Sequence, residues 1–400
     1  MAHPLDSGPH CMVHTTIDFN LPETRQLRYV LRGCGQNAGI WNSSAGIPTS
    51  SQNADTGTVT SAEESTLETQ HPASRLKESE FFIMWLAVLV VLVLILLYRW
   101  YRQSQILENL SDKYVFITGC DSGFGNMLAK QLDKRGMRVL AACLTDTGAE
   151  TLKKETSSRL QTLKLDITDS KSVSSAANWV SITVGNAGLW GVVNNAGFGF
   201  ALAPNEWQKV EDFSKVLNIN LLGMINVTLN LLHLVRKARG RIVNVSSGAG
   251  RLSIFGGGYC ISKYGVEAFS DSLRREMRDF GVKVSIIEPG TFQTLMANSM
   301  DGHGNNLRRL WENLPTALKD SYGQRYYDQY MKVLQNLVRS ASPRAHMVSD
   351  CMEHAVTAIY PWTRYSPGWD CKLYLLPISY LPTVISDYLL CRSAPKPACM

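Results

Sequence analysis

The sequence lacks the cysteine and charge patterns that mark several large protein classes. Its nine cysteines include no Cys-x-x-Cys pair and no Cys/His cluster at metal-ligand spacing, so free thiols are expected and no metal is indicated. Lysine and arginine exceed the acidic residues by six, but they form no basic block. The sequence therefore gives no reason to expect a nucleic-acid partner.

The first fifth of the chain has little that could build a core. Residues 42–70 contain few large apolar side chains, and such a segment cannot bury enough surface to offset its ordering entropy. No signal-peptide hydrophobic region follows Met1. Residues 1–80 are therefore predicted to be a disordered N-terminal extension.

One long hydrophobic run does occur, at residues 81–98. It carries no charge and consists mostly of leucine, valine and isoleucine, and as a helix it would span about 27 Å, close to the thickness of a bilayer core. Aromatic residues flank both ends, as at membrane interfaces. The run is predicted to be a transmembrane anchor, with a buried core helix as the alternative. Flanking positive charges balance, so a cytosolic catalytic domain follows only if the working chain starts at Met84.

From Asp112 onward, short apolar runs alternate with helical stretches. Strands are predicted at 114–118, 138–142, 160–165, 191–194, 241–246 and 283–288, and helices lie between them, including 211–235 and 262–280. This alternation predicts an α/β protein with a Rossmann-type doubly wound parallel sheet and helices on both faces, preceded by one transmembrane helix. Residues 112–400 would form the catalytic domain, ending in a segment that meets substrate or membrane.

Glycine-rich and polar motifs follow four of the predicted strands. The carboxyl ends of parallel strands meet at one edge of a sheet, where ligands bind. The stretch from Gly119 to Gly125 joins a strand to a helix, so its backbone can approach a pyrophosphate at the helix N-terminus. Tyr259 and Lys263 are four residues apart and would share one helix face. There the ammonium would lower the pKa of the phenol and make it a usable base.

These motifs together resemble the short-chain dehydrogenase/reductase family, and longer stretches resemble its membrane-bound retinol dehydrogenase and 3α/17β-hydroxysteroid dehydrogenase subgroup. The likeness covers about Met84 to the C-terminus. It implies hydride transfer between NAD and a lipophilic alcohol, retinol or a 3α- or 17β-hydroxysteroid. It also implies that the protein is anchored in the endoplasmic reticulum membrane, that it contacts membrane lipid, and that it can form a homodimer. The stretches are Phe116–Gly125, Gly256–Lys263, Glu267–Arg275 and Tyr365–Asp370.

The resemblance also implies roles for single residues. Tyr259 would remove the hydroxyl proton, Lys263 would lower the pKa of Tyr259 and bind the nicotinamide ribose, and Ser247 would hold the substrate oxygen. Asn220 would position a water that relays the proton. The cofactor would contact Gly119, Ser122, Gly123, Phe124, Gly125, Asp146, Asp166, Asn195, Ala196, Gly197, Tyr259, Lys263, Pro289, Gly290 and Thr294.

Several alternatives stay open at this level. Ser246 competes with Ser247, and Asn218 competes with Asn220. Asp146 would reach the adenosine ribose or only cap the next turn.

The form of the cofactor can be argued from charge. A 2′-phosphate requires a nearby Arg or Lys, and neither the turn with Asp121 nor residues 143–146 hold one, which favours NAD over NADP. The rival functions are an NADPH-linked carbonyl reductase on the same fold and a catalytically idle scaffold that binds NAD or lipid at a membrane. Apolar residues in the stretch 292–314 are predicted to cover the substrate pocket.

Overall fold

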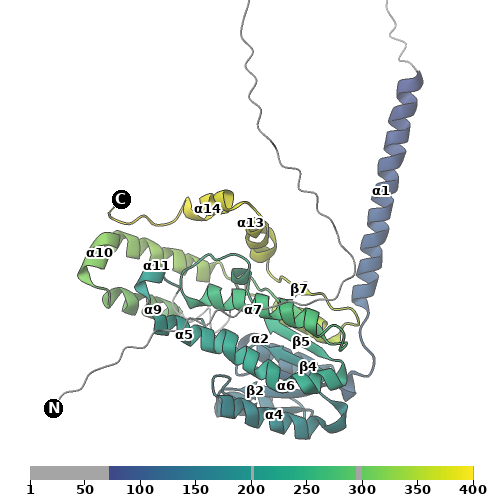
Figure 1. Cartoon of the computed structure of the whole chain (residues 1–400), viewed down its shortest axis with the longest axis horizontal. Helices are drawn as coiled ribbons and strands as arrows, with labels where there is room; N and C mark the ends of the chain where they lie inside the picture. Colours follow the sequence, from purple (N-terminus) through teal and green to yellow (C-terminus); the bar gives the residue numbers. More distant parts are fainter. Residues whose placement is uncertain (1–71, 200–201, 294–299, 400) are drawn as a thin grey trace, which may run out of the picture. The chain divides into compact units, whose positions relative to one another are not determined.

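The computed structural model describes residues 72–199, 202–293 and 300–399, all within one unit of the chain, residues 71–400. At its centre lies a seven-stranded sheet with the order β3-β2-β1-β4-β5-β6-β7, in which every neighbouring pair is parallel (Figure 1). The predicted doubly wound α/β fold is confirmed. The strands are β1 Tyr114–Thr118, β2 Arg138–Cys143, β3 Leu160–Lys164, β4 Gly191–Asn194, β5 Arg241–Val245, β6 Lys283–Ile287 and β7 Arg364–Tyr365.

Strands β1 to β6 lie where the apolar runs predict them, and their ends differ from the prediction by at most one residue. The sequence does not predict β7, because two residues are too few to show a strand pattern. β7 extends the sheet by pairing with Ile286 and Ile287 of β6. The order reverses between β1 and β4, and this switch point is where parallel sheets of this type open a ligand crevice.

Helices cover both faces of the sheet. On one face α2 and α12 contribute Leu128, Leu132 and Met352 to a buried cluster, and on the other α4, α6 and α7 bury Val180 and Leu231. The helices are α2 Gly123–Lys134, α3 Asp146–Lys154, α4 Ser170–Val184, α5 Val210–Leu217, α6 Met224–Ala238, α7 Gly258–Glu276, α9 Met300–Glu312, α10 Thr316–Tyr322, α11 Gln324–Arg339, α12 His346–Thr357, α13 Leu376–Ser379 and α14 Thr383–Cys391, with the short 3₁₀ turns η1 Leu110–Asp112, η2 Gly185–Ala187, η3 Asn205–Trp207 and η5 Gly248–Gly250.

The central strands are apolar along their whole length because both of their faces are buried. In β1, Val115 and Ile117 point into one cluster, whereas Phe116 between them points into the other. Successive strand side chains alternate between faces. A strand covered by helices on both sides therefore shows a continuous apolar run, which is the pattern that predicts these strands.

A single helix was predicted for residues 211–235, but the structure divides it. A π-helix, η4 Asn218–Gly223, separates α5 from α6. Such turns are rare and occur frequently at functional sites. The combined stretch 210–238 is long and apolar enough to resemble a membrane span, but it is partly buried against the sheet and supplies part of the core.

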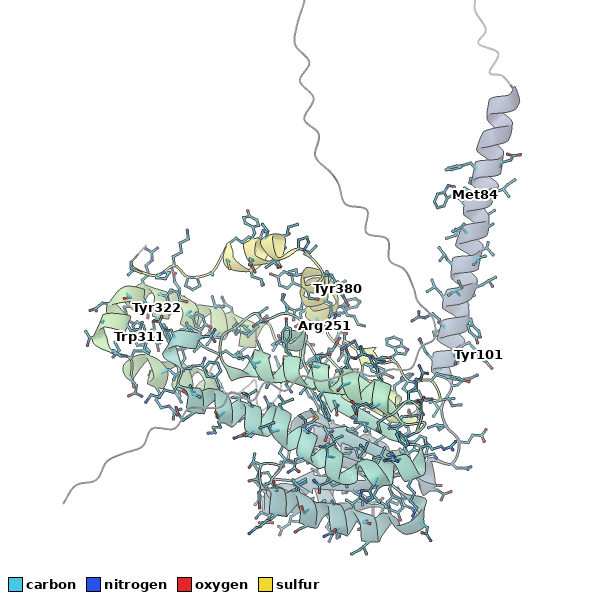
Figure 2. The ribbon with its side chains drawn as sticks, in the orientation of Figure 1. Met84, Tyr101, Arg251, Trp311, Tyr322 and Tyr380 are labelled. Atoms are coloured by element: carbon cyan, nitrogen blue, oxygen red, sulfur yellow. The ribbon has the colours of Figure 1, made fainter. Side chains whose placement is uncertain are left out.

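The hydrophobic run predicted as an anchor lies within α1, Pro72–Ser104. Between Phe81 and Tyr98 its large apolar side chains are 43–68% exposed, and Figure 2 shows them projecting from the helix. A helix that is apolar on every side requires an apolar surrounding, and the stretch 80–104 has the length and hydropathy of a membrane span. These features, together with the family described below, indicate a membrane-anchored protein.

The C-terminal end of α1 and the residues after it contact the catalytic unit directly. The Gln103 carbonyl oxygen lies 2.8 Å from Nε2 of His354, and the Leu107 amide donates to the Thr357 carbonyl. The Arg102 guanidinium stacks 3.8 Å from the centre of the Tyr360 ring. The anchor thus ends in ordered contacts with α12 and the segment after it.

Candidate active site

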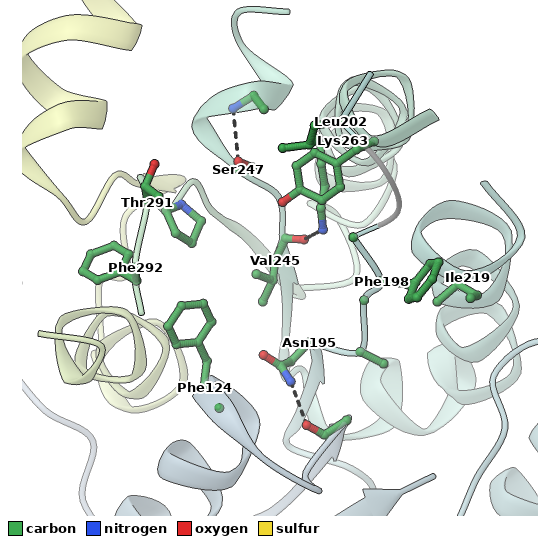
Figure 3. A pocket seen from close by; sticks show the side chains of 18 of the residues that line it. Phe124, Asn195, Phe198, Leu202, Ile219, Val245, Ser247, Lys263, Thr291 and Phe292 are labelled. Atoms are coloured by element: carbon green, nitrogen blue, oxygen red, sulfur yellow. Dashed lines mark hydrogen bonds between the residues drawn. The ribbon is translucent and has the colours of Figure 1, made fainter. Parts of the chain in front are cut away.

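A cavity of about 710 Å³ lies at the carboxyl ends of the strands (Figure 3). Loops that follow β1, β2, β3, β4, β5 and β6 all contribute to its wall, and so does α11. Most of the predicted site residues line it. They are Gly119, Ser122, Gly123, Phe124, Asp166, Asn195, Ala196, Gly197, Ser247, Tyr259, Lys263, Pro289 and Gly290.

Three of the predicted site residues have other positions. Gly125, Asp146 and Asn220 do not line the cavity. Gly125 lies behind the glycine turn, where an added Cβ would sit 2.4 Å from Nδ2 of Asn195. Thr294 lies outside the described residues.

The glycine turn after β1 is held by the loop after β4. The Asn195 amide group donates to the carbonyl oxygens of Thr118 and Gly119, both at 3.0 Å. Gly119 has a φ of +70°, and a Cβ there would lie 2.8 Å from Cα of Ala196, so only glycine fits. Ser122 caps α2 at the cavity. The bare backbone and the helix N-terminus form a suitable cradle for a pyrophosphate.

Asp121 lines the cavity beside the loop after β2, whereas Asp146 does not. Its oxygens accept hydrogen bonds from the backbone amides of Leu144 at 2.8 Å and Thr145 at 2.9 Å. Asp146 instead begins α3, is largely exposed and pairs with Lys164 at 2.6 Å. The sequence argument that no basic residue approaches this region is therefore incomplete, because the neighbouring strand β3 brings Lys164 to it.

Asp166 lies at the end of β3 and contacts its own turn. Its Oδ1 accepts hydrogen bonds from the amide and the hydroxyl of Thr168, at 2.9 and 2.7 Å. The residue lines the cavity. Its carboxylate shapes the turn that would border an adenine ring.

Tyr259 and Lys263 lie in the first two turns of α7, so both reach the cavity from one helix face. The Lys263 ammonium donates to the Val245 carbonyl at 2.9 Å and lies 5.7 Å from the centre of the Tyr259 ring. This contact with the end of β5 holds the lysine beside the tyrosine. Figure 3 shows Lys263 and Ser247 on either side of this corner of the cavity.

Burial governs the ionisation of both groups. Burial raises the pKa of Tyr259, and the neighbouring Ser247 hydroxyl lowers it by a smaller amount. Burial lowers the pKa of Lys263 to about 8, against the opposite effect of the Glu267 carboxylate. The sequence predicts a lowered pKa for the tyrosine, but in the structure the loss of hydration on burial raises it.

The structure distinguishes Ser247 from Ser246. Ser246 is 2% exposed, and its hydroxyl donates to the Lys263 carbonyl at 3.3 Å. The Ser247 oxygen accepts a hydrogen bond from the Ala249 amide at 3.1 Å, and its hydroxyl is also hydrogen-bonded to the Tyr259 side chain. Ser247 therefore faces the phenol inside the cavity, where both groups can reach the same substrate oxygen. This geometry favours Ser247 as the substrate-contacting serine.

Asn220 is buried, whereas its alternative, Asn218, is exposed. The Asn220 amide is already satisfied by protein groups. Its Oδ1 accepts from the Phe198 amide at 2.7 Å, and its Nδ2 donates to the Phe198 carbonyl and to the Ser262 hydroxyl, both at 3.0 Å. The side chain therefore positions the β4 loop against the catalytic helix, and a relayed water would need another group of this π-turn.

The loop after β6 forms another part of the cavity wall. Pro289, Gly290 and Thr291 line it, and the Thr291 amide donates to Asp370 at 2.6 Å. Phe292 is buried and packs edge-to-face on Phe124, with ring centres 6.1 Å apart. These two rings join the β6 loop to the glycine turn.

Part of the apolar wall of the cavity comes from α11, which the sequence does not single out. Met331, Leu334, Gln335 and Val338 face the cavity with helical spacing. Within the stretch 292–314, Phe292 lines the cavity as predicted, and so does Gly304. The large residues of α9 behave differently, because Leu307 and Trp311 pack in a cluster with Trp207. Helix α9 thus supports α11, whose many charged residues obscure its apolar stripe.

A cluster of charged residues lies behind Tyr259 and Lys263, and the sequence did not predict it. Arg364 of β7 pairs with Glu267, one turn after the active-site lysine, and with Glu288 at 2.9 Å. Arg251 pairs with Glu288 at 3.1 Å and donates to the Tyr380 hydroxyl at 2.8 Å (Figure 2). The cluster joins α7, the serine loop, the β6 loop and the C-terminal segment, which are far apart in the sequence.

Comparison with known proteins gives the family. The family described as short chain dehydrogenase matches residues 113–303. Retinol dehydrogenase 7 of Rattus norvegicus is 56% identical over 315 residues, which cover 79% of this chain and 99% of that protein. The chain belongs to the short-chain dehydrogenase family. It is an oxidoreductase with the fold and the motif set of that family.

Two further similarities agree with this assignment. The 17-beta-hydroxysteroid dehydrogenase type 6 of Homo sapiens is 54% identical over 315 residues, again 79% of this chain and 99% of that protein. A short chain dehydrogenase/reductase from Burkholderia phymatum, solved in complex with NAD, has a TM-score of 0.56 at 22% identity and covers 72% of this chain and 98% of its own. At that identity the solved structure supports the fold alone.

Proposed function

We propose that this short-chain dehydrogenase oxidises the hydroxyl-bearing carbon of a lipophilic alcohol, a retinoid or a hydroxysteroid, with NAD as the hydride acceptor. The observation that carries the proposal is the cavity itself. It joins a backbone cradle suited to a dinucleotide to an apolar chamber whose reaction corner holds Ser247, Tyr259 and Lys263. The names of the relatives support the choice of substrate class.

The reaction corner supplies a base and a hydrogen-bond donor. Ser247 donates its hydroxyl proton to the substrate oxygen, and Tyr259 removes the proton from that same oxygen. Lys263 stabilises the phenolate form because its ammonium lies beside the ring. The backbone cradle after β1 would hold NAD, which would supply the hydride acceptor and a positive charge near this corner. Asn220 holds the β4 loop and Ser262 in place around these groups.

The test is an assay of the full-length protein in membranes. NAD is added with retinol, with a 3α-hydroxysteroid, with a 17β-hydroxysteroid or with ethanol, and reduced cofactor is followed by absorbance. Oxidation of a retinoid or a steroid supports the proposal, and ethanol should react poorly because it buries little apolar surface. Reduction of carbonyls by NADPH alone, or cofactor binding with no turnover, would instead support one of the two rival functions.

We expect NAD to be preferred over NADP by at least tenfold in kcat/KM. The Asp121 carboxylate lines the cavity, and a 2′-phosphate beside it would bring like charges together. Asp121→Asn should reduce the preference while keeping the side chain's size. Asp279→Asn, an exposed carboxylate outside the cavity, is the matched control and should leave it unchanged. An equal preference in the wild-type protein would refute the charge argument.

The membrane anchor proposed here is α1, in the endoplasmic reticulum, with the catalytic domain in the cytosol. Asn109 of the sequon Asn109-Leu110-Ser111 is exposed, so it would accept a glycan if the catalytic domain were lumenal. The absence of a glycan on the expressed protein would agree with the cytosolic side. A glycan there would reverse the orientation.

Residues 1–83 should be dispensable for anchoring and activity. A chain that begins at Met84 keeps most of the apolar helix and is expected to remain in the membrane pellet after carbonate washing. A chain that begins at Gln103 keeps the contacts with His354 and Ile359 but lacks the span, so it should be released. Release of the chain that begins at Met84 would contradict a spanning helix.

The C-terminal segment is proposed to touch the membrane as well as the substrate. Leu375 lines the cavity, while Leu373 and Tyr380 are 69% and 75% exposed, and Val384 of α14 is 83% exposed. Pro382 interrupts the segment, so it is suited to the bilayer surface rather than to crossing it. Such a position would give lipophilic alcohols a route from lipid into the cavity.

A further inference from the structure

One polar side chain of the cavity has no place in the mechanism described above. Among the described residues after Phe292, Gln335 is the single polar residue that lines the cavity. Its neighbours on the same face of α11 are Met331, Leu334 and Val338, all apolar. The sequence stretch gave no hint of it, because polar residues are common throughout α11.

The Gln335 amide has no protein partner in the described structure, where polar side chains that belong to the architecture are bonded. Asn195, Asn220 and Gln208 each donate to backbone carbonyls of neighbouring loops. Gln335 is half-buried and makes no such bond. A ligand that displaces water from the cavity would leave this amide unpaired, which is unfavourable in an apolar space, unless the ligand itself supplies a hydrogen-bond partner.

We propose that Gln335 is a specificity-determining residue that binds a second oxygen atom of the substrate, distant from the reacting hydroxyl. An amide can donate to a ketone or exchange hydrogen bonds with a hydroxyl. Hydroxysteroids commonly carry such an oxygen at the far end of a rigid ring system. Retinol has a single oxygen. That oxygen would be bound by Ser247 and Tyr259, so none would remain for Gln335. The geometry therefore favours an oxygenated steroid over a retinoid.

The inference rests on the proposed function, because it assumes that the reacting hydroxyl lies at Tyr259. It also rests on the fact that the two polar parts of the cavity are supplied by different secondary-structure elements. Ser247 and Tyr259 come from the loop after β5 and from α7, whereas Gln335 comes from α11. A substrate must therefore contact two different elements to satisfy both.

The test compares two substrates that differ by one oxygen. A 3α-hydroxysteroid with a ketone at carbon 17 and its 17-deoxy analogue are oxidised with NAD by the wild-type protein, by Gln335→Leu and by Asn336→Leu. Asn336 is the next residue on α11 and is exposed outside the cavity, so it controls for the loss of an amide from this helix. Retinol serves as a third substrate.

The wild-type protein is expected to favour the ketone-bearing steroid by about tenfold or more in kcat/KM, because an unpaired amide penalises the deoxy analogue. Gln335→Leu should bring the ratio close to one, chiefly through the KM of the ketone, and it should leave retinol oxidation unchanged or faster. Asn336→Leu should keep the wild-type ratio.

Two results would overturn the inference. The first is an unchanged steroid ratio in Gln335→Leu. The second is a raised KM for NAD with all three substrates, which would show that the amide serves the cofactor. Oxidation of retinol but of neither steroid would also reject it while leaving the proposed function intact. Failure of the wild-type protein to oxidise any of the three would reject the proposed function itself.

Discussion

Tyr259→Phe is expected to lower kcat by about a thousandfold while leaving the affinity for NAD nearly unchanged. The ring and its packing on α7 remain, and only the proton acceptor is lost, which is the usual magnitude for removing a general base. Steady-state kinetics with a steroid or retinol gives kcat, and quenching of tryptophan fluorescence by the bound cofactor gives the affinity.

Tyr264→Phe is the matched control, since Tyr264 lies on the same helix, is 44% exposed and does not line the cavity. It should retain full activity. Near-normal turnover by Tyr259→Phe would remove this tyrosine from the mechanism. Loss of cofactor affinity in the same variant would point to a structural defect instead.

Lys263→Met is expected to abolish turnover to a similar extent and, unlike the tyrosine variant, to weaken cofactor binding. The methionine keeps the apolar stem but removes the ammonium that stabilises the phenolate and that would meet the nicotinamide ribose. Lys283→Met is the control. Lys283 is the first residue of β6, so it lies at the amino end of the strands, away from the cavity, and it also donates to a backbone carbonyl, that of Ile359 at 2.6 Å. It should retain activity.

The same variant has a stability signature that loss of an exposed lysine would not produce. Burial lowers the pKa of Lys263 to about 8 from its ordinary value of 10.5, a difference on the order of 3 kcal/mol. Between these two pH values the unfolded chain binds more protons than the folded one, so the wild-type protein gains stability from this group as pH rises.

Thermal unfolding at pH 7 and at pH 9.5 measures this effect as the difference in Tm between wild type and Lys263→Met. The wild-type Tm should rise relative to that of the variant as pH increases. A difference that does not change with pH would show that the lysine has its ordinary pKa in the folded protein.

Much of this protein could be predicted from local patterns in its sequence. Continuous apolar runs between glycine-rich turns predict β1 to β6, because strands covered on both faces show no polar alternation. Tyr259 and Lys263 share a helix face because their spacing is one helical turn. The uncharged run of 81–98 predicts the anchor for the same kind of reason, since a bilayer requires about twenty apolar residues in succession.

Other features depend on contacts between residues that are distant in the sequence. Lys164 approaches Asp146 only because β3 pairs with β2, and Asp121 lines the cavity because its turn folds back onto the loop after β2. One part of the cavity wall comes from α11, whereas the large residues of α9 pack on Trp207.

The pKa values of Tyr259 and Lys263 also depend on contacts between distant parts of the chain. A sequence shows that an ammonium is close to a phenol, but only the tertiary structure shows how little water reaches either group, and here the loss of hydration sets the direction of both pKa shifts. The sequence thus determined strands β1 to β6, the apolar helix of the anchor and the order of the motifs along the chain. The tertiary structure decided which side chains enter the cavity and how they are charged, because packing brings together elements that no local pattern connects.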